Sequence, residues 1–74
     1  LKLNIMTTYR TLNTETTNNN GIEIVVTTIQ KTINTMTPFI TTYFAMTING
    51  NSVGPHELQQ RHVEFYTNNS RMYS

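Results

Sequence analysis

Apolar and polar residues alternate along the start of the chain, which is the pattern of a half-buried β-strand. Leu1, Leu3 and Ile5 fall on one face, and Lys2 and Asn4 on the other. We predict a first strand over Leu3–Leu12. The next residues, Asn13 to Gly21, include no large apolar side chain. They predict a loop, in which Asn20-Gly21 is a pair that tolerates positive φ.

The segment Ile22–Met36 fits two structures. Its apolar residues fall mostly on a helical stripe, and Asn20 with Glu23 three residues later resembles a helix cap. However, ten of its fifteen residues are β-branched, and each is about 0.5 kcal/mol poorer than alanine in a helix. We predict a strand over Ile22–Ile29, with a helix as a nearly equal alternative.

The stretch "FITTYFAMTI", which follows Pro38, predicts a third strand over Phe39–Ile48. It combines aromatic and β-branched residues with alternation, and it places Tyr43 and Phe44 on opposite faces. Coverage on both faces suits a central strand. Asn49-Gly50 is the strongest turn signal in the chain. The residues after it leave little room for another strand, so the turn is expected to lead into the last element.

That last element is predicted to be a helix from Pro55 to about Tyr66. Proline favours the first helical position, and the spacing of Glu57 and Arg61 favours an ion pair within the helix. We expect Leu58, Phe65 and Tyr66 to dock on the sheet. The tail from Thr67 is expected to be frayed. The predicted fold is therefore α+β, with a small antiparallel sheet of about three strands and one C-terminal helix in a single domain over residues 1–74.

Composition changes this picture by making a self-sufficient core difficult. Only 36% of the 74 residues are hydrophobic, and there is no Trp and no Cys. Domains this small usually need disulfides, a metal or association with other chains. Since cysteine is absent, association is the expected remedy. We predict an interface on the third strand, formed by Phe39, Tyr43, Phe44 and Met46.

Charge excludes further classes of function. Charged residues make up 12% of the chain, against about 25% in typical soluble domains, and the formal net charge is +1. The Lys and Arg residues do not cluster, so nucleic-acid binding is not predicted. No apolar run reaches the 18 residues that a membrane-spanning helix needs. The 15 Thr and 10 Asn residues give a neutral, hydrogen-bonding surface. This surface suits contact with protein or glycan and slightly favours an extracellular or virion-associated protein.

The stretch "GPHELQQRH" raises the question of a zinc site, because a His-Glu pair followed by a second His is typical of zinc hydrolases. Their two histidines are four residues apart, which places both on one helical face. Here His56 and His62 are six apart, and on a helix they point about 120° away from each other. We therefore predict no metal and no cofactor.

The sequence contains no other catalytic pattern. The three serines lack a nucleophile-elbow sequence, and Glu57 and Glu64 are about 10.5 Å apart along a helix, too far for a glycosidase pair. Asn68-Asn69-Ser70 matches the N-glycosylation pattern, which arises easily by chance in an Asn-rich chain. We predict a non-catalytic structural or interaction subunit of a homo-oligomer or larger assembly, such as a filament, capsid or secreted complex. A glycan-binding module is the alternative, and an enzyme with a site shared between subunits is third.

Overall fold

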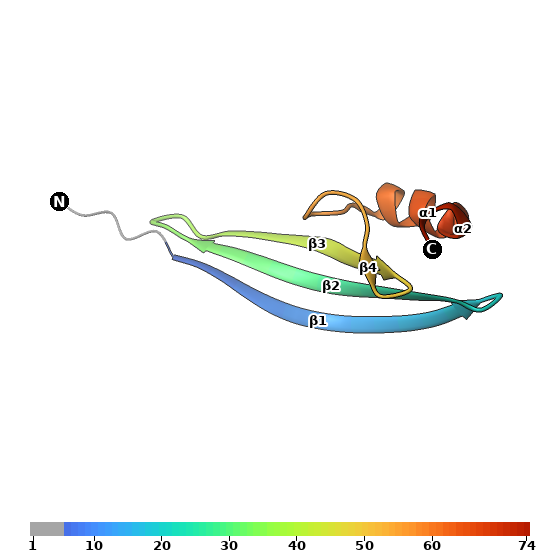
Figure 1. The fold of residues 1–74 in the computed structure, drawn as a ribbon. Helices are drawn as coiled ribbons and strands as arrows, with labels where there is room; N and C mark the ends of the chain where they lie inside the picture. Colours follow the sequence, from blue (N-terminus) through green and yellow to red (C-terminus); the bar gives the residue numbers. More distant parts are fainter. Residues whose placement is uncertain (1–5) are drawn as a thin grey trace.

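A computed structural model describes residues 6–74, which form a four-stranded antiparallel sheet and two short helices (Figure 1). The strands lie in sequence order, as β1 (Met6–Asn19), β2 (Ile22–Asn34), β3 (Phe39–Ile48) and β4 (Asn51–Ser52). The helices are α1 (Gln60–Asn68) and α2 (Ser70–Tyr73). The α+β prediction is confirmed.

Two hairpins are closed by Asn-Gly turns. Asn20 and Gly21 have φ of 54° and 84°, and Asn49 and Gly50 have φ of 49° and 81°. Positive φ at both central residues defines the two-residue turn whose twist matches that of paired strands. The predicted turn at Asn49-Gly50 is therefore confirmed, and Asn20-Gly21, which was expected to tolerate positive φ within a loop, forms a turn as well. However, the second turn leads into β4, a short strand that was not predicted from the sequence.

The predicted loop over Asn13–Gly21 is wrong as far as Asn19. β1 continues to Asn19 and pairs with β2 along its whole length, with one irregularity between Thr11 and Asn13. All of its residues are exposed, so burial does not explain this part of the strand. Backbone hydrogen bonds to β2 and the β-propensity of its threonines stabilise it instead. Leu3 to Ile5, the predicted start, lie outside the described residues.

β2 resolves the ambiguity of Ile22–Met36 in favour of a strand. It runs to Asn34, past the predicted end at Ile29, and pairs with β1 on one side and β3 on the other. A central strand forms ladder hydrogen bonds on both edges, and these outweigh a helical spacing of apolar residues. β3 has the predicted bounds.

The helix begins at Gln60, so the predicted start at Pro55 is wrong. Leu58 is held in a β-bridge to Phe44, with both backbone hydrogen bonds at 2.9 Å. This bridge holds Leu58 beside β3, and residues 54–57 before it form bends and not a helical turn. For the same reason Glu57 is not in the helix and pairs with Lys31, not with Arg61. The residues from Thr67, expected to be frayed, complete α1 and form α2, in which Ser70 is buried.

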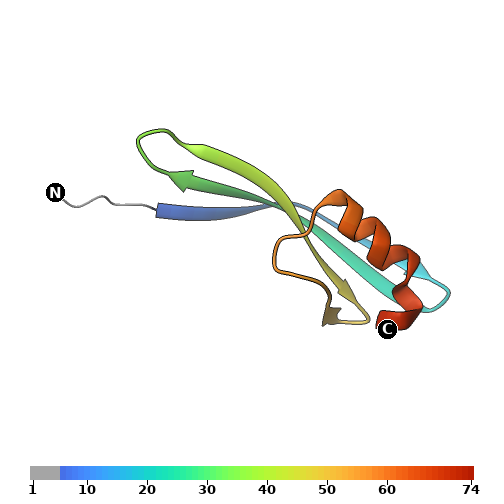
Figure 2. The same ribbon diagram turned by 90° about the horizontal axis from the view of Figure 1, so that it is seen from above.

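The core is small and lies between one end of the sheet and α1. Its buried side chains are Ile24, Met46, Ile48, Val53 and Leu58. Val63 and Tyr66 pack against it, as expected for Tyr66, but Phe65 is 53% exposed and does not dock. The helices cover only the half of the sheet nearest the β1–β2 turn (Figure 2). The radius of gyration is 15.2 Å, whereas a compact chain of this length has about 11 Å.

Candidate functional site

The strand register assigns each side chain to a face of the sheet, because directly opposite residues share a face. Ile24 lies opposite Ile48, and Val26 opposite Met46. These residues pack against the helix side, which we call the covered face. The alternate residues of β2 and β3 lie on the other side, which we call the open face.

The open face bears an apolar stripe along the two inner strands. β2 contributes Val25, Ile29 and Ile33, and these are half-buried. Register places Tyr43 opposite Ile29, Phe39 opposite Ile33, and Tyr9 opposite Lys31. Tyr9 is 62% and Phe39 59% exposed. Within the part of the chain that the structure describes, both helices pack on the covered face, so no helix covers this stripe.

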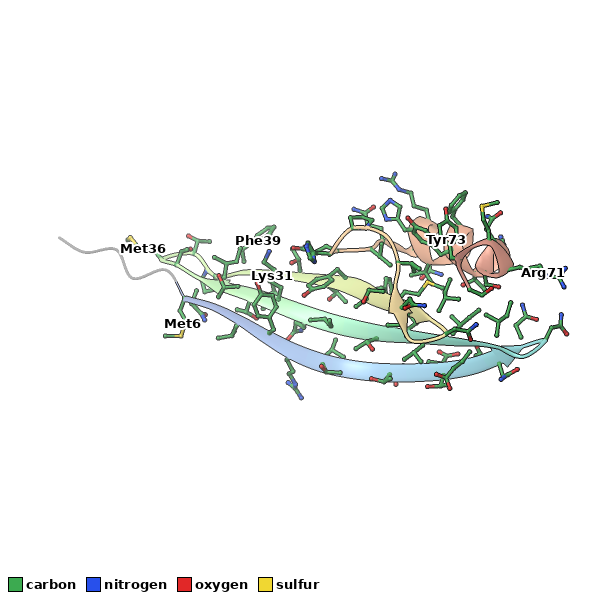
Figure 3. The ribbon with its side chains drawn as sticks, viewed as in Figure 1. Met6, Lys31, Met36, Phe39, Arg71 and Tyr73 are labelled. Atoms are coloured by element: carbon green, nitrogen blue, oxygen red, sulfur yellow. The ribbon has the colours of Figure 1, made fainter. Side chains whose placement is uncertain are left out.

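The apolar stripe continues into the end of the sheet farthest from the helices. Phe39, Lys31 and Met36 lie toward this end, whereas Arg71 and Tyr73 belong to α2 at the other end (Figure 3). Ile40 at this end is on the covered face by register, yet it is 58% exposed. This end of the sheet therefore has large apolar side chains exposed on both faces.

The four predicted interface residues divide between the two faces. Phe39 and Tyr43 lie on the open face. Met46 is only 2% exposed and belongs to the core, and Phe44 packs against the core. Sequence reasoning missed Val25, Ile29, Ile33 and Tyr9. Alternation alone does not reveal which face the helix covers, although the period of two in each strand does group these residues together.

The ion pair between Lys31 and Glu57 ties the loop before α1 to β2. The Lys31 Nζ donates a hydrogen bond to the Glu57 carboxylate at 3.0 Å. That hydrogen bond and the attraction of the carboxylate raise the pKa of Lys31 above its ordinary value. The stabilising contribution of this pair is therefore full below the ordinary pKa of lysine, about 10.4, and is lost as the pH rises through the raised value.

The two histidines have unrelated surroundings. His62 Nδ1 accepts a hydrogen bond from the backbone N–H of Gln59 at 2.9 Å, which satisfies a free donor at the start of α1. His56 is exposed in the preceding loop. No group of three or more His, Asp or Glu side chains suited to a metal ion occurs among residues 6–74.

The hydrogen bond from the backbone N–H of Gln59 to His62 Nδ1 predicts a modest structural role for His62. His62→Ala should destabilise the fold by about 1 kcal/mol, because the N–H of Gln59 loses its partner. His62→Gln should restore most of this loss, since glutamine at the same helix position also offers an acceptor. Urea unfolding of the three proteins measures the difference. Equal losses in both variants would contradict the capping role.

A hollow of about 290 Å³ separates α1 from β1 on the covered face. Ile24, Val26, Phe44 and Val63 supply its apolar lining, and Glu15 is its only charged lining residue. The other lining residues are neutral and polar: Asn13, Thr17, Thr28, Gln60 and Thr67.

No helix in the described residues is long and apolar enough to cross a membrane. The chain matches no protein-family model, no curated protein and no solved structure in sequence or structural comparison.

Proposed function

We propose that this protein is a non-catalytic structural subunit that associates with further copies of itself, in a homo-oligomer or a larger assembly. The observation that carries the proposal is the apolar stripe of the open face. Single exposed apolar residues are common on proteins, but apolar side chains gathered along one face often mark an interaction site. Here they run along β2 and β3, and Lys31, which pairs with Glu57, interrupts them between Ile29 and Ile33.

The small core gives a second reason for association. Five hydrophobic residues are buried among those described, and a chain of this size keeps much of its surface exposed even when folded. Packing two open faces together buries Ile29, Ile33 and Tyr43 and gives the sheet a second apolar layer. Sheets stack face to face at about 10 Å, which suits side chains of this size.

The elongated shape also suits assembly. The molecule measures 55 × 18 × 18 Å, and its long axis follows the strands (Figure 1). A narrow sheet offers a long contact surface for a small mass, so one protomer can bury a stable interface of about 800 Å². A filament or shell made of such subunits would be held by surface complementarity and needs no bound cofactor.

The test is a matched pair of charge substitutions on the two faces. Wild-type protein is expected to sediment as an oligomer at micromolar concentration. Ile29→Lys, on the open face, should weaken self-association at least about thirtyfold, because the charge must be desolvated at the centre of the contact. Ile40→Lys is the control, since it makes the same substitution on the covered face, where Ile40 is 58% exposed and Ile29 of the open face is half-buried.

Analytical ultracentrifugation over a range of concentrations measures both effects, and circular dichroism confirms that the variants fold. A wild-type protein that remains a folded monomer at high concentration would overturn the proposal. Equal dissociation of Ile29→Lys and Ile40→Lys would remove the open face as the contact.

A further inference from the structure

The direction of the backbone groups along β1 follows from the hydrogen bonds at the other side of the sheet. Phe44 exchanges both backbone hydrogen bonds with Leu58, and the carbonyl of Met46 accepts one from Val53. The backbone N–H and C=O groups of the even-numbered residues of β3 therefore point away from β2, and those of the odd-numbered residues point toward it. The odd-numbered residues of β3 bond to odd-numbered residues of β2. The even-numbered residues of β2 are then the ones that form backbone hydrogen bonds with β1.

Applied to β1, this alternation identifies the residues with free backbone groups. Arg10, Asn13 and Glu15 lie opposite even-numbered residues of β2 and bond inward. The residues of β1 that lie opposite odd-numbered residues of β2 present their N–H and C=O groups to the outer edge of the sheet: Thr7, Tyr9, Thr11, Thr14, Thr16 and Asn18. β1 is an edge strand with no second strand partner among residues 6–74. It also lacks proline and lysine, two features that protect edge strands from pairing.

We infer that the partner at this edge is a second copy of the chain, whose β1 pairs antiparallel with the first β1 about a two-fold axis between Leu12 and Asn13. This inference rests on the self-association proposed above and adds a second contact to it. In this register the outward residues meet one another: Thr11 faces Thr14 of the second copy, Tyr9 faces Thr16, and Thr7 faces Asn18. Counting both halves of the symmetric contact, about twelve backbone hydrogen bonds form.

The charges of β1 select this register over its neighbours. Arg10 and Glu15 are the only charged residues of the strand. Both lie on the covered face, since they are opposite Gln30 and Val26. The two-fold axis places Arg10 of each copy directly opposite Glu15 of the other, so the contact contains two cross-strand ion pairs. A shift by two residues in either direction separates these charges.

The irregularity in β1 is consistent with the same axis. The register with β2 slips between Thr11 and Asn13, which leaves Leu12 as the extra residue of a bulge. A bulge bends its strand, and a bulge at one point of an edge normally obstructs pairing. With the axis beside Leu12, both strands bend at the same place and the contact stays symmetric.

The helices leave room for the second copy. α1 borders Asn13, Glu15 and Thr17 across the hollow and lies over the half of the sheet nearest the β1–β2 turn (Figure 2). The two-fold axis sets this half of one copy beside the Met6–Leu12 half of the other. The two helices therefore lie at opposite ends of the joined sheet, and each borders an uncovered half of its neighbour.

The test uses two charge reversals, each of which should weaken β1 pairing between identical chains, while a mixture of the two variants should restore it. Arg10→Glu places Glu against Glu in its own dimer, and Glu15→Arg places Arg against Arg. Each should weaken edge pairing by about tenfold or more, because two ion pairs become two repulsive pairs. When the variants are mixed, one chain carries two acids and the other two bases, so a mixed dimer regains both ion pairs. Native mass spectrometry of the mixture should show it in excess over both homodimers.

Hydrogen exchange in wild-type protein supplies an independent readout. The outward amides of Tyr9, Thr11, Thr14 and Thr16 should become protected as the concentration rises through the assembly range. If wild-type protein assembles but these amides exchange freely and mixing restores nothing, the edge contact is wrong and self-association through the open face stands. If wild-type protein does not assemble at any concentration, both proposals fail.

Discussion

Leu58→Ala is expected to lower the free energy of unfolding by about 2–4 kcal/mol. Leu58 is fully buried and packs with Ile24, Met46 and Ile48 beneath Tyr66. Removing its side chain loses transfer free energy and leaves a cavity, which the backbone bridge to Phe44 prevents from closing. A chain of this length has a total stability of about 4–11 kcal/mol. The substitution therefore removes a large share of it.

Phe65→Ala is the matched control for this substitution. The Phe65 side chain is larger than that of Leu58, but it is 53% exposed. Its ring packs edge to face with the ring of Tyr66, and the ring centroids are 5.4 Å apart. Its removal should cost no more than about 1.5 kcal/mol. Urea unfolding monitored by circular dichroism distinguishes the two variants. A greater loss from Phe65→Ala than from Leu58→Ala would mean that the helix docks through a different face.

Gly54→Ala should destabilise the protein by about 2–5 kcal/mol through two separate effects. The φ of Gly54 is +76°, a conformation that strains any residue with a Cβ atom. A Cβ atom there would also lie 2.7 Å from Leu58 Cδ2 and 2.8 Å from Tyr66 Cε2. Both neighbours belong to the packed region and cannot move aside without disturbing the core.

Gly21→Ala separates the backbone strain from the clash. Gly21 has a similar φ of +84°, but a Cβ atom added there meets no atom within 4 Å. This variant should lose only about 1–2 kcal/mol. The difference in unfolding free energy between the two variants measures the clash at Gly54. Equal losses would show that Leu58 and Tyr66 yield to the methyl group and that the loop is not closely packed on the core.

Local physical chemistry made several elements predictable from the sequence. β3 has the predicted bounds because aromatic and β-branched residues alternate between a proline and an Asn-Gly turn. Both Asn-Gly pairs form turns because asparagine and glycine accept positive φ at low cost. The α+β class follows from these strands and from one apolar helical stripe at the end of the chain.

Long-range pairing determined the rest. Asn13 to Asn19 bury nothing, so no apolar pattern marks them as a strand, and only pairing with β2 extends β1 through them. The start of α1 depends on the bridge between Leu58 and Phe44, which are fourteen positions apart and meet only in the folded sheet. The alternation in β3 puts Tyr43 and Phe44 on opposite faces but does not say which face a helix covers. The helix packs on Phe44, Met46 and Ile48, because Leu58 is anchored on that side of the sheet. Tyr43 and its neighbours in β2 thereby form the open face.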